Sequence, residues 1–448
     1  MTRLLLFALF FLAIGPAPSQ VPAAPPYRDP TRSTDDRVRD LLSRMTLEEK
    51  FWQLYMIPGD LDDPAHDYTH GIFGLQVRPA RERSVDAGPA GSRPGDAARR
   101  HAERINAIQR FFVEKTRLGI PIIPFEEAVH GLVADGATMF PQAIALAATW
   151  DVPLMRRVAA AIADETRSRG IRQVLSPVVN IADDVRWGRV EETYGEDPYL
   201  SSMMGVAYAD TLERAGIVAT PKHFVANVGE GGRDSYPIQH SDRLLSERYF
   251  PPFAAAVRQA RARSIMTAYN SVDGSPATQN RWLLTDVLRG RWGFGGFVIS
   301  DAAATGGATV LHMTEPDTPS AASHAWASGL DVVFQTSYEQ HRPYYEAVRR
   351  GLVSPSVIDA AVARVLRVKF ELGLFEHPYV DPAAAATANG NGEHLALARE
   401  AARASTVLLK NEHGVLPLAP RVRSVALIGQ DAAEARLGGY SGRGVATV

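Results

Sequence analysis

The stretch most capable of chemistry is GFVISDA, residues 296–302, in which a short apolar run ends in a carboxylate, Asp301. Only small residues follow it, as far as Gly307. A strand that delivers a charged group to an open mouth is the way in which an α/β barrel builds an active site at the C-terminal ends of its strands. An aspartate that caps a helix at a strand–helix turn would give the same pattern. The rest of the chain must decide between a reactive Asp301 and a capping one.

Asp301 is one of several polar side chains that close an apolar run. Seven such runs between residues 71 and 335 alternate with helical stretches, which predicts parallel strands joined by crossover helices. The residues at their ends are Glu127, Asn180, Lys222, His223, Tyr269, Asn270, Asp301 and Gln335. Each alone could be a satisfied core group. Because the C-terminal ends of the strands converge in a TIM-like (β/α)₈ barrel, we predict this α/β fold with these side chains at one mouth, although one strand of the eight is not identified.

The segment before the first apolar run is predicted to be helical. Residues 35–56 read as two helices, the second beginning with a capping box of Thr46 and Glu49. Apolar side chains at positions 47, 51, 54 and 55 have the spacing of one helix face.

Composition limits the kinds of partner and cofactor. The 448 residues carry a formal net charge of −2 and no cysteine. No block of lysine and arginine supports a nucleic-acid or anionic-membrane partner. The absence of cysteine excludes disulfides, thiolate metal sites and cysteine nucleophiles, and no HExxH-like cluster indicates zinc. We therefore expect neither a metal nor a cofactor.

The chain divides into three parts. Arg3 and the apolar run from Leu4 to Ile14, followed by proline and small residues, predict a secretory signal and linker over residues 1–24. The run is too short to span a bilayer, so we expect a secreted or periplasmic protein with no integral membrane segment after signal cleavage. Residues 25–385 form the expected barrel. From residue 386, an amphipathic helix and the expected strands STVLLKN and VRSVALIG predict the incomplete start of a second α/β domain.

A series of motifs resembles glycoside hydrolase family 3, the β-glucosidase and β-xylosidase group. In chain order they are FEEAVHG, DGATMFPQAIALAATWD, RWGRVEETYGEDPYL, KHF followed by GGRDS, SIMTAYNSVDG, GFVISDA and SGLDVVF. The tail STVLLKNEHGVLPL and the run VALIG resemble the start of that family's C-terminal α/β sandwich domain. The resemblance implies an exo-acting retaining β-glycosidase that hydrolyses terminal β-D-glucosyl or β-D-xylosyl residues of oligosaccharides or glycosides.

The resemblance also implies roles for single residues. Asp301 stands where the family has its catalytic nucleophile, and Tyr269 matches the tyrosine beside it. Glu127 occupies the place of a carboxylate that grips hydroxyls at the non-reducing end. The residues at positions that bind sugar hydroxyls are Arg189, Lys222, His223 and Arg233. Basic groups at the same mouth would favour the ionised form of Asp301 that nucleophilic attack requires.

The sequence departs from the family pattern in two respects. Ala302 follows Asp301 where many family β-glucosidases have tryptophan, and xyloside-active members also lack that tryptophan. The general acid/base is expected from the second domain, beyond the end of this sequence. Three carboxylates of the motif VEETYGED, Glu191, Glu192 and Glu196, are interpreted as structural.

Three alternatives stay open. A catalytically impaired carbohydrate-binding barrel would fit a chain without its general acid. A β-N-acetylhexosaminidase would carry a His–Asp pair in the loop KHFVANVGEGGRDSYP, where Asp234 and Ser235 are present but the following histidine is absent. An aldolase would use Lys222 to form a Schiff base, which the motif series does not support.

Overall fold

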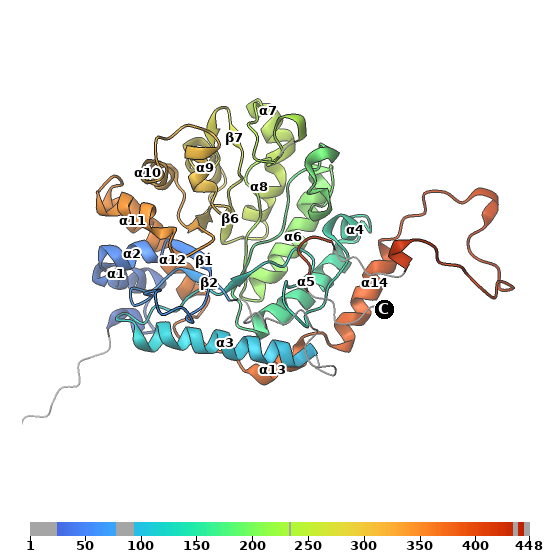
Figure 1. Ribbon diagram of the computed structural model, residues 1–448, viewed down its shortest axis with the longest axis horizontal. Helices are drawn as coiled ribbons and strands as arrows, with labels where there is room; N and C mark the ends of the chain where they lie inside the picture. Colours follow the sequence, from blue (N-terminus) through green and yellow to red (C-terminus); the bar gives the residue numbers. More distant parts are fainter. Residues whose placement is uncertain (1–24, 78–93, 233, 433–437, 443–448) are drawn as a thin grey trace, which may run out of the picture.

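The computed structural model describes residues 25–77, 94–232, 234–432 and 438–442. Short parallel strands lie at the centre of the molecule and helices surround them, so the fold belongs to the α/β class (Figure 1). The parallel strands are β1 (Tyr55–Pro58), β2 (Gly74–Gln76), β3 (Phe125–Glu126), β4 (Gln173–Val174), β5 (Val218–Ala219), β6 (Ser264–Met266), β9 (Phe297–Ile299) and β10 (Val333–Phe334). An antiparallel hairpin of β7 (Ser271–Val272) and β8 (Ser275–Pro276) follows β6.

Helices fill the connections between the strands. They are α1 (Thr34–Arg44), α2 (Leu47–Trp52), α3 (Pro94–Lys115), α4 (Ala143–Ala147), α5 (Val152–Ser168), α6 (Pro198–Arg214), α7 (Asp242–Leu244), α8 (Phe250–Arg258), η6 (Trp282–Arg291), α9 (Ala304–Val310), α10 (Thr318–Ser328), α11 (His341–Arg349), α12 (Pro355–Glu371), α13 (Pro382–Ala388) and α14 (Gly392–Ala404). Helices α5, α6 and α10 each begin after an aspartate whose side chain accepts a hydrogen bond from a first-turn amide. Each also has proline in its first turn, where a missing N–H costs nothing.

The strands pair in three parallel groups. Strand β1 lies between β10 and β2, β4 lies between β3 and β5, and β6 pairs with β9. Further backbone hydrogen bonds run from one group to the next. Ile123 donates to Phe73 (3.0 Å), Phe224 donates to Met266 (2.8 Å), and the residue before β10, Val332, donates to β9 (2.9 Å).

Apolar side chains from the strands fill the space that the strands enclose. The rings of Phe73 and Phe297, beside β2 and on β9, meet edge to face with centroids 5.3 Å apart. Those of Phe125 and Phe334, on β3 and β10, meet in the same way at 5.5 Å. All four are buried, so residues from strands that do not pair share one core.

The prediction of two helices over residues 35–56 is partly wrong. The capping box is confirmed, because the Thr46 hydroxyl accepts from the Glu49 amide (3.2 Å) and the Glu49 carboxylate accepts from the Thr46 amide (2.8 Å). Helix α2 nevertheless ends at Trp52, and Tyr55 to Pro58 form β1, the strand that the apolar pattern did not identify. Positions 54 and 55 fit helical spacing, but pairing with strands on both sides stabilises the extended form instead.

The part of the chain after residue 386 matches the sequence prediction only in its helix. The amphipathic stretch forms α14, but the expected strands STVLLKN and VRSVALIG are not strands, because no described backbone pairs with them. Apolar side chains there are exposed, with Leu409 91% and Ile428 93% accessible. In Figure 1 this segment extends away from the helices as a loop.

Candidate functional site

Asp301 lies directly beyond β9, where the strand direction carries it out of the core. Its side chain is buried, with 8% of the residue exposed. The backbone amide of Ala302 donates to its Oδ1 at 2.7 Å, and His223 Nε2 lies 3.5 Å from its Oδ2. Ala303 then adopts a positive φ of 60° and precedes α9, which turns the chain away and leaves the carboxylate at the C-terminal ends of the parallel strands, the region called the mouth below.

Lys222 and Glu127 form a buried ion pair beside this carboxylate. Lys222 follows β5 and is 1% exposed, and its Nζ lies 2.9 Å from each oxygen of Glu127, which follows β3. Burial opposes the charge of Lys222, but Glu127 and, more weakly, Asp301 raise the pKa of the amine above its usual value. The lysine is therefore held as an ammonium group.

His223 is fixed as a neutral imidazole with a defined tautomer. Asn180 Oδ1 accepts from the His223 backbone amide at 2.8 Å and lies 2.9 Å from Nδ1, so Nδ1 carries the proton. Nε2 then accepts from Arg189 Nη2 at 3.0 Å. Burial, Arg189 and Lys222 hold the pKa of His223 well below its usual range. The imidazole therefore orients its neighbours and does not donate a proton to Asp301.

Arg189 connects three loops at the mouth. Its guanidinium donates to both oxygens of Glu192 (2.8 and 2.9 Å), to Asp234 (3.2 Å) and to the Tyr440 hydroxyl (3.4 Å). Glu192, three residues further along a short helical turn, accepts from the guanidinium with both oxygens and so orients it. The candidate residues did not include Asp234 or Tyr440. Asp234 had a sequence signal, because it lies next to Arg233 in the loop considered above for a His–Asp pair, whereas Tyr440 had none.

Tyr269 lies beside Asp301 and affects its ionisation. Burial raises the pKa of Asp301, while Lys222, the Ala302 amide, Arg189 and a hydrogen bond from Tyr269 lower it. The net direction is upward, so the basic groups only partly offset the burial. Conversely, burial and the charge of Asp301 raise the pKa of the Tyr269 hydroxyl, which therefore stays protonated and able to donate.

The structure brings together six of the seven candidate residues. They are Glu127, Arg189, Lys222, His223, Tyr269 and Asp301. The seventh, Arg233, lies outside the described residues. The other polar residues at strand ends support loops: Asn180 holds His223, Asn270 accepts from the Asn227 amide at 3.0 Å, and Gln335 donates to the Tyr344 hydroxyl at 2.7 Å.

A segment distant in sequence, residues 438–442, also contacts the mouth. The ring of Tyr440 covers Lys222, with Nζ 4.8 Å from the ring centre. The Gly439 carbonyl accepts from His130 (3.1 Å) and from Gln142 (3.0 Å), and the Gly439 amide donates to Glu191 (3.1 Å). The backbone contacts of Gly439 and the ring of Tyr440 thus hold this segment in place.

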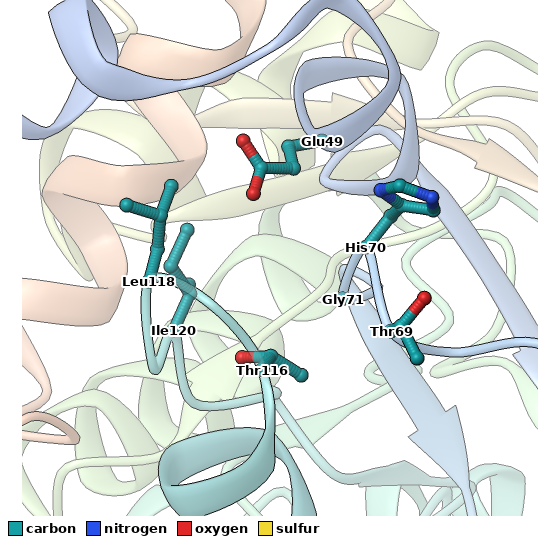
Figure 2. A pocket seen from close by; sticks show the side chains of 7 residues that line it. All are labelled: Glu49, Thr69, His70, Gly71, Thr116, Leu118 and Ile120. Atoms are coloured by element: carbon teal, nitrogen blue, oxygen red, sulfur yellow. The ribbon is translucent and has the colours of Figure 1, made fainter.

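A small pocket elsewhere does not share this chemistry. Figure 2 shows it between Glu49, His70 and Leu118, which precede β1, β2 and β3 and so lie at the opposite ends of the strands from Asp301. Its one carboxylate, Glu49, already binds Arg117 at 2.9 Å and the Thr46 amide.

Among the described residues no cluster of three or more His, Asp or Glu side chains is arranged to hold a metal ion. No described helix has both the length and the apolar content needed to cross a bilayer.

Comparison with known proteins places these residues in a family. The glycosyl hydrolase family 3 N terminal domain matches residues 46–368, and the C-terminal domain of the same family matches residues 406–448. A β-xylosidase of Formosa agariphila is 36% identical over 370 residues, 76% of this chain and 51% of that protein. A periplasmic β-glucosidase of Salmonella typhimurium is 33% identical over 427 residues, 92% of this chain and 52% of that protein.

Solved structures agree with these relatives. A β-glucosidase from Erythrobacter marinus superposes with a TM-score of 0.85 at 36% identity and covers 94% of this chain and 56% of its own. A β-glucosidase from Listeria innocua in complex with glucose gives 0.73 at 30% identity, with 87% and 53% covered. The chain spans about half the length of the curated relatives it matches. The matched N-terminal domain alone covers well over half of the residues, and the chain belongs to glycosyl hydrolase family 3.

Proposed function

We propose that this chain carries the nucleophilic machinery of a retaining β-glycosidase, with Asp301 as the nucleophile. The observation that carries the proposal is a buried carboxylate at the end of β9, oriented by the Ala302 amide and by Tyr269. A retaining glycosidase needs such a carboxylate in one orientation to attack the anomeric carbon. Relatives named β-glucosidase and β-xylosidase support this assignment.

The proposed substrate is a terminal, non-reducing β-D-glucosyl or β-D-xylosyl residue of an oligosaccharide or glycoside. A sugar ring offers hydroxyls that both donate and accept, and the Glu127–Lys222 pair can accept from one and donate to its neighbour. Arg189 and His223 supply further polar atoms beside Asp301. Arg233 is proposed as another hydroxyl ligand on sequence grounds alone. No cofactor or metal takes part in the proposed chemistry.

The chemistry proceeds in two displacements at one carbon. An Asp301 oxygen forms a bond to the anomeric carbon while the glycosidic C–O bond breaks, and the leaving oxygen takes a proton from a carboxyl group. Water then attacks the same carbon, and the bond to Asp301 breaks. The raised pKa of Tyr269 keeps its hydroxyl protonated beside Asp301.

We also propose that the eight parallel strands close into a (β/α)₈ barrel. The hydrogen bonds that link the three strand groups support closure, and so do the Phe73–Phe297 and Phe125–Phe334 contacts across the centre. In this arrangement residues 25–385 form the catalytic domain and residues 386–448 begin a C-terminal α/β sandwich domain. The separate matches of the two family domains support this division.

A secreted or periplasmic location is proposed from the N-terminal sequence. The basic and then apolar pattern of residues 1–24 has the form of a secretory signal, and these residues lie outside the described part of the structure. The periplasmic location in the name of the Salmonella relative supports the proposal.

Covalent trapping tests the proposed nucleophile. The protein is incubated with 2-deoxy-2-fluoro-β-glucosyl and β-xylosyl donors that carry dinitrophenolate, and the adduct is located by peptide mass. We expect labelling of Asp301, and the sugar that labels faster identifies the preferred substrate. Asp301→Asn should not label, whereas Asp273→Asn, a matched change on an exposed turn, should label normally. A folded protein that neither donor labels would favour the carbohydrate-binding alternative.

A further inference from the structure

A groove lies among the helices that surround the strands, apart from the mouth. Its volume is about 310 Å³, which falls within the range of about 300–1,000 Å³ for small-molecule sites. The residues that line it are Ser246, Phe250, Pro251, Ala254, Arg258, Val287, Arg291 and Trp292. None of them takes part in the contacts described above for Asp301, Lys222 and Arg189. The groove therefore has a chemistry of its own.

Helix α8 and the segment before it supply one wall of the groove. Ser246 lies on η5 (Leu245–Tyr249), and Phe250, Ala254 and Arg258 follow at intervals of four residues, which places them along one helix face. At 1.5 Å per residue this face is roughly 18 Å long. Ala254, in the middle of the wall, has a side chain of one carbon and so leaves space there. The groove is therefore long enough for more than one sugar ring.

The end of η6 supplies the opposite wall. The Trp292 amide donates to the Val287 carbonyl, five residues earlier, at 3.1 Å, so the turn is wider here than in an α-helix. On the first wall the Phe250 amide donates to the Leu245 carbonyl with the same spacing. Such π-helical turns are rare and occur frequently at functional sites. Here they lie on both sides of one groove.

The indole ring of Trp292 is fixed in place without being covered. The phenyl rings of Phe224 and Phe250 meet it edge to face, with centroids 5.6 and 5.3 Å away. Trp292 is nevertheless partly exposed and lines the groove. The face of an aromatic ring carries partial negative charge, which attracts the C–H groups on the face of a sugar ring. The groove thus offers a rigid aromatic surface of the size of one ring.

Two exposed guanidinium groups make the groove positively charged. Arg258 Nη2 donates to the Arg291 carbonyl at 2.8 Å, and the Arg291 guanidinium lies 5.8 Å from the centre of the Trp282 ring. No acidic residue lines the groove, and no carboxylate in the described part of the chain forms an ion pair with either arginine. Glu247, next to Ser246 in sequence, is bonded to Arg243 at 2.8 Å. Both guanidinium groups can therefore donate to an anionic ligand.

This combination of groups favours one class of ligand. A carboxylate can accept two parallel hydrogen bonds from a guanidinium, which a neutral ligand cannot match. An acidic peptide would also meet the arginines, but both walls are helical and present no strand edge with which a peptide backbone could pair. An acidic sugar uses every kind of group that is present. Its ring face packs on Trp292, its hydroxyls meet Ser246, and its carboxylate meets an arginine.

We propose that the groove between α8 and the end of η6 binds an oligosaccharide that contains uronic acid residues. A sugar ring packs on Trp292, and carboxylates of the ligand pair with Arg258 and Arg291. The groove holds the oligosaccharide without making or breaking a bond in it. The proposal goes beyond the reaction proposed at Asp301 and does not depend on it.

Isothermal titration calorimetry with trigalacturonate tests this site. We expect saturable binding at millimolar or lower concentrations that weakens as sodium chloride is added, because the attraction between exposed charges is screened. Replacing both arginines, Arg258→Gln with Arg291→Gln, should weaken binding by about 10-fold or more, the effect of losing one charge-assisted hydrogen bond. Ala254→Trp fills the groove without changing its charge and should abolish binding. Each variant should keep the melting temperature of the wild type within a few degrees.

Two controls separate the groove from general electrostatics and from the mouth. The double variant Arg99→Gln with Arg214→Gln removes the same charge from two exposed positions elsewhere, with side chains 48% and 79% exposed, and should bind as the wild type does. An excess of methyl β-glucoside, a ligand for the proposed reaction centre, should not displace trigalacturonate.

Several outcomes would overturn the proposal. The fully methyl-esterified trisaccharide has the same rings without the charge, so equal binding of it would refute recognition of the acid. Tighter binding of a tri-aspartate peptide would assign the groove to an acidic protein segment instead. Displacement by methyl β-glucoside, or unchanged binding in the Ala254→Trp and double arginine variants, would place the ligand elsewhere. A folded wild-type protein that shows no saturable binding would refute the site altogether.

Discussion

Replacing Glu127 by glutamine should strongly destabilise the fold, because it leaves the ammonium group of Lys222 buried without its ion-pair partner. Lys222 is 1% exposed and contacts both oxygens of Glu127 at 2.9 Å. Breaking a buried pair by removing one partner costs about 3–5 kcal/mol of unfolding free energy. The ring of Tyr440, 4.8 Å from Nζ, retains roughly 0.5–2 kcal/mol of compensation. We therefore expect a loss of about 3 kcal/mol.

The assay is urea denaturation followed by two probes whose transitions must coincide. A double variant, Glu127→Gln with Lys222→Met, removes the orphaned charge and should recover part of the loss. Glu247→Gln breaks an exposed pair with Arg243, whose side chains are 62% and 84% exposed, and should cause no measurable change. A Glu127→Gln protein that is as stable as the Glu247→Gln control would refute the reasoning, because Lys222 would then not depend on its partner.

Three further changes test other parts of the structure. Tyr269→Phe removes a hydrogen bond that lowers the pKa of Asp301, so the acid limb of the labelling rate against pH should move to higher pH; an unmoved limb would contradict this contact. His394→Gln should flatten the dependence of unfolding free energy on pH above 6.5. The hydrogen bond to Glu165 raises the pKa of His394 in the folded protein. The stabilisation that protonated His394 contributes is therefore complete below pH 6.5 and is lost as the pH rises through the raised pKa. Gly74→Ala should lower the melting temperature steeply, because its Cβ would collide with the Ile123 carbonyl oxygen just before β3, and an unchanged melting temperature would mean that β2 and the segment leading into β3 can separate.

The sequence predicted which polar residues the fold brings together better than it predicted the elements around them. The polar residues at the ends of apolar runs are detectable because strands of one direction bring their C-terminal ends together. Glu127, Lys222 and Asp301 meet for this reason, although they lie at positions far apart in the chain. Their position at strand ends was enough to predict that they lie near one another, without any pattern that links one residue to another.

Contacts between loops could not be predicted in the same way. Arg189 contacts Asp234, 45 residues away in sequence, and Tyr440, 251 residues away. No helix or strand periodicity relates residues at these separations, so no pattern indicates that they are in contact. Glu192 is the exception, because a spacing of three residues on a helical turn places two side chains on one face. Strand β1 was missed because its residues do show a periodic pattern, but the pattern is helical. Only pairing with strands on both sides makes this segment extended.

The pairing of β1 with β10 sets a delay for the chain as it leaves the ribosome. Tyr55 finds β2 fewer than twenty positions later, but its other neighbour, Val333, is made 278 positions later. At about 5–20 residues per second, one edge of β1 waits about 14–56 s for its partner. During that interval a short apolar strand has an open edge that another nascent chain can pair with. Slower translation between residues 58 and 333 should therefore increase aggregation of this protein, whereas slower translation after residue 333 should not.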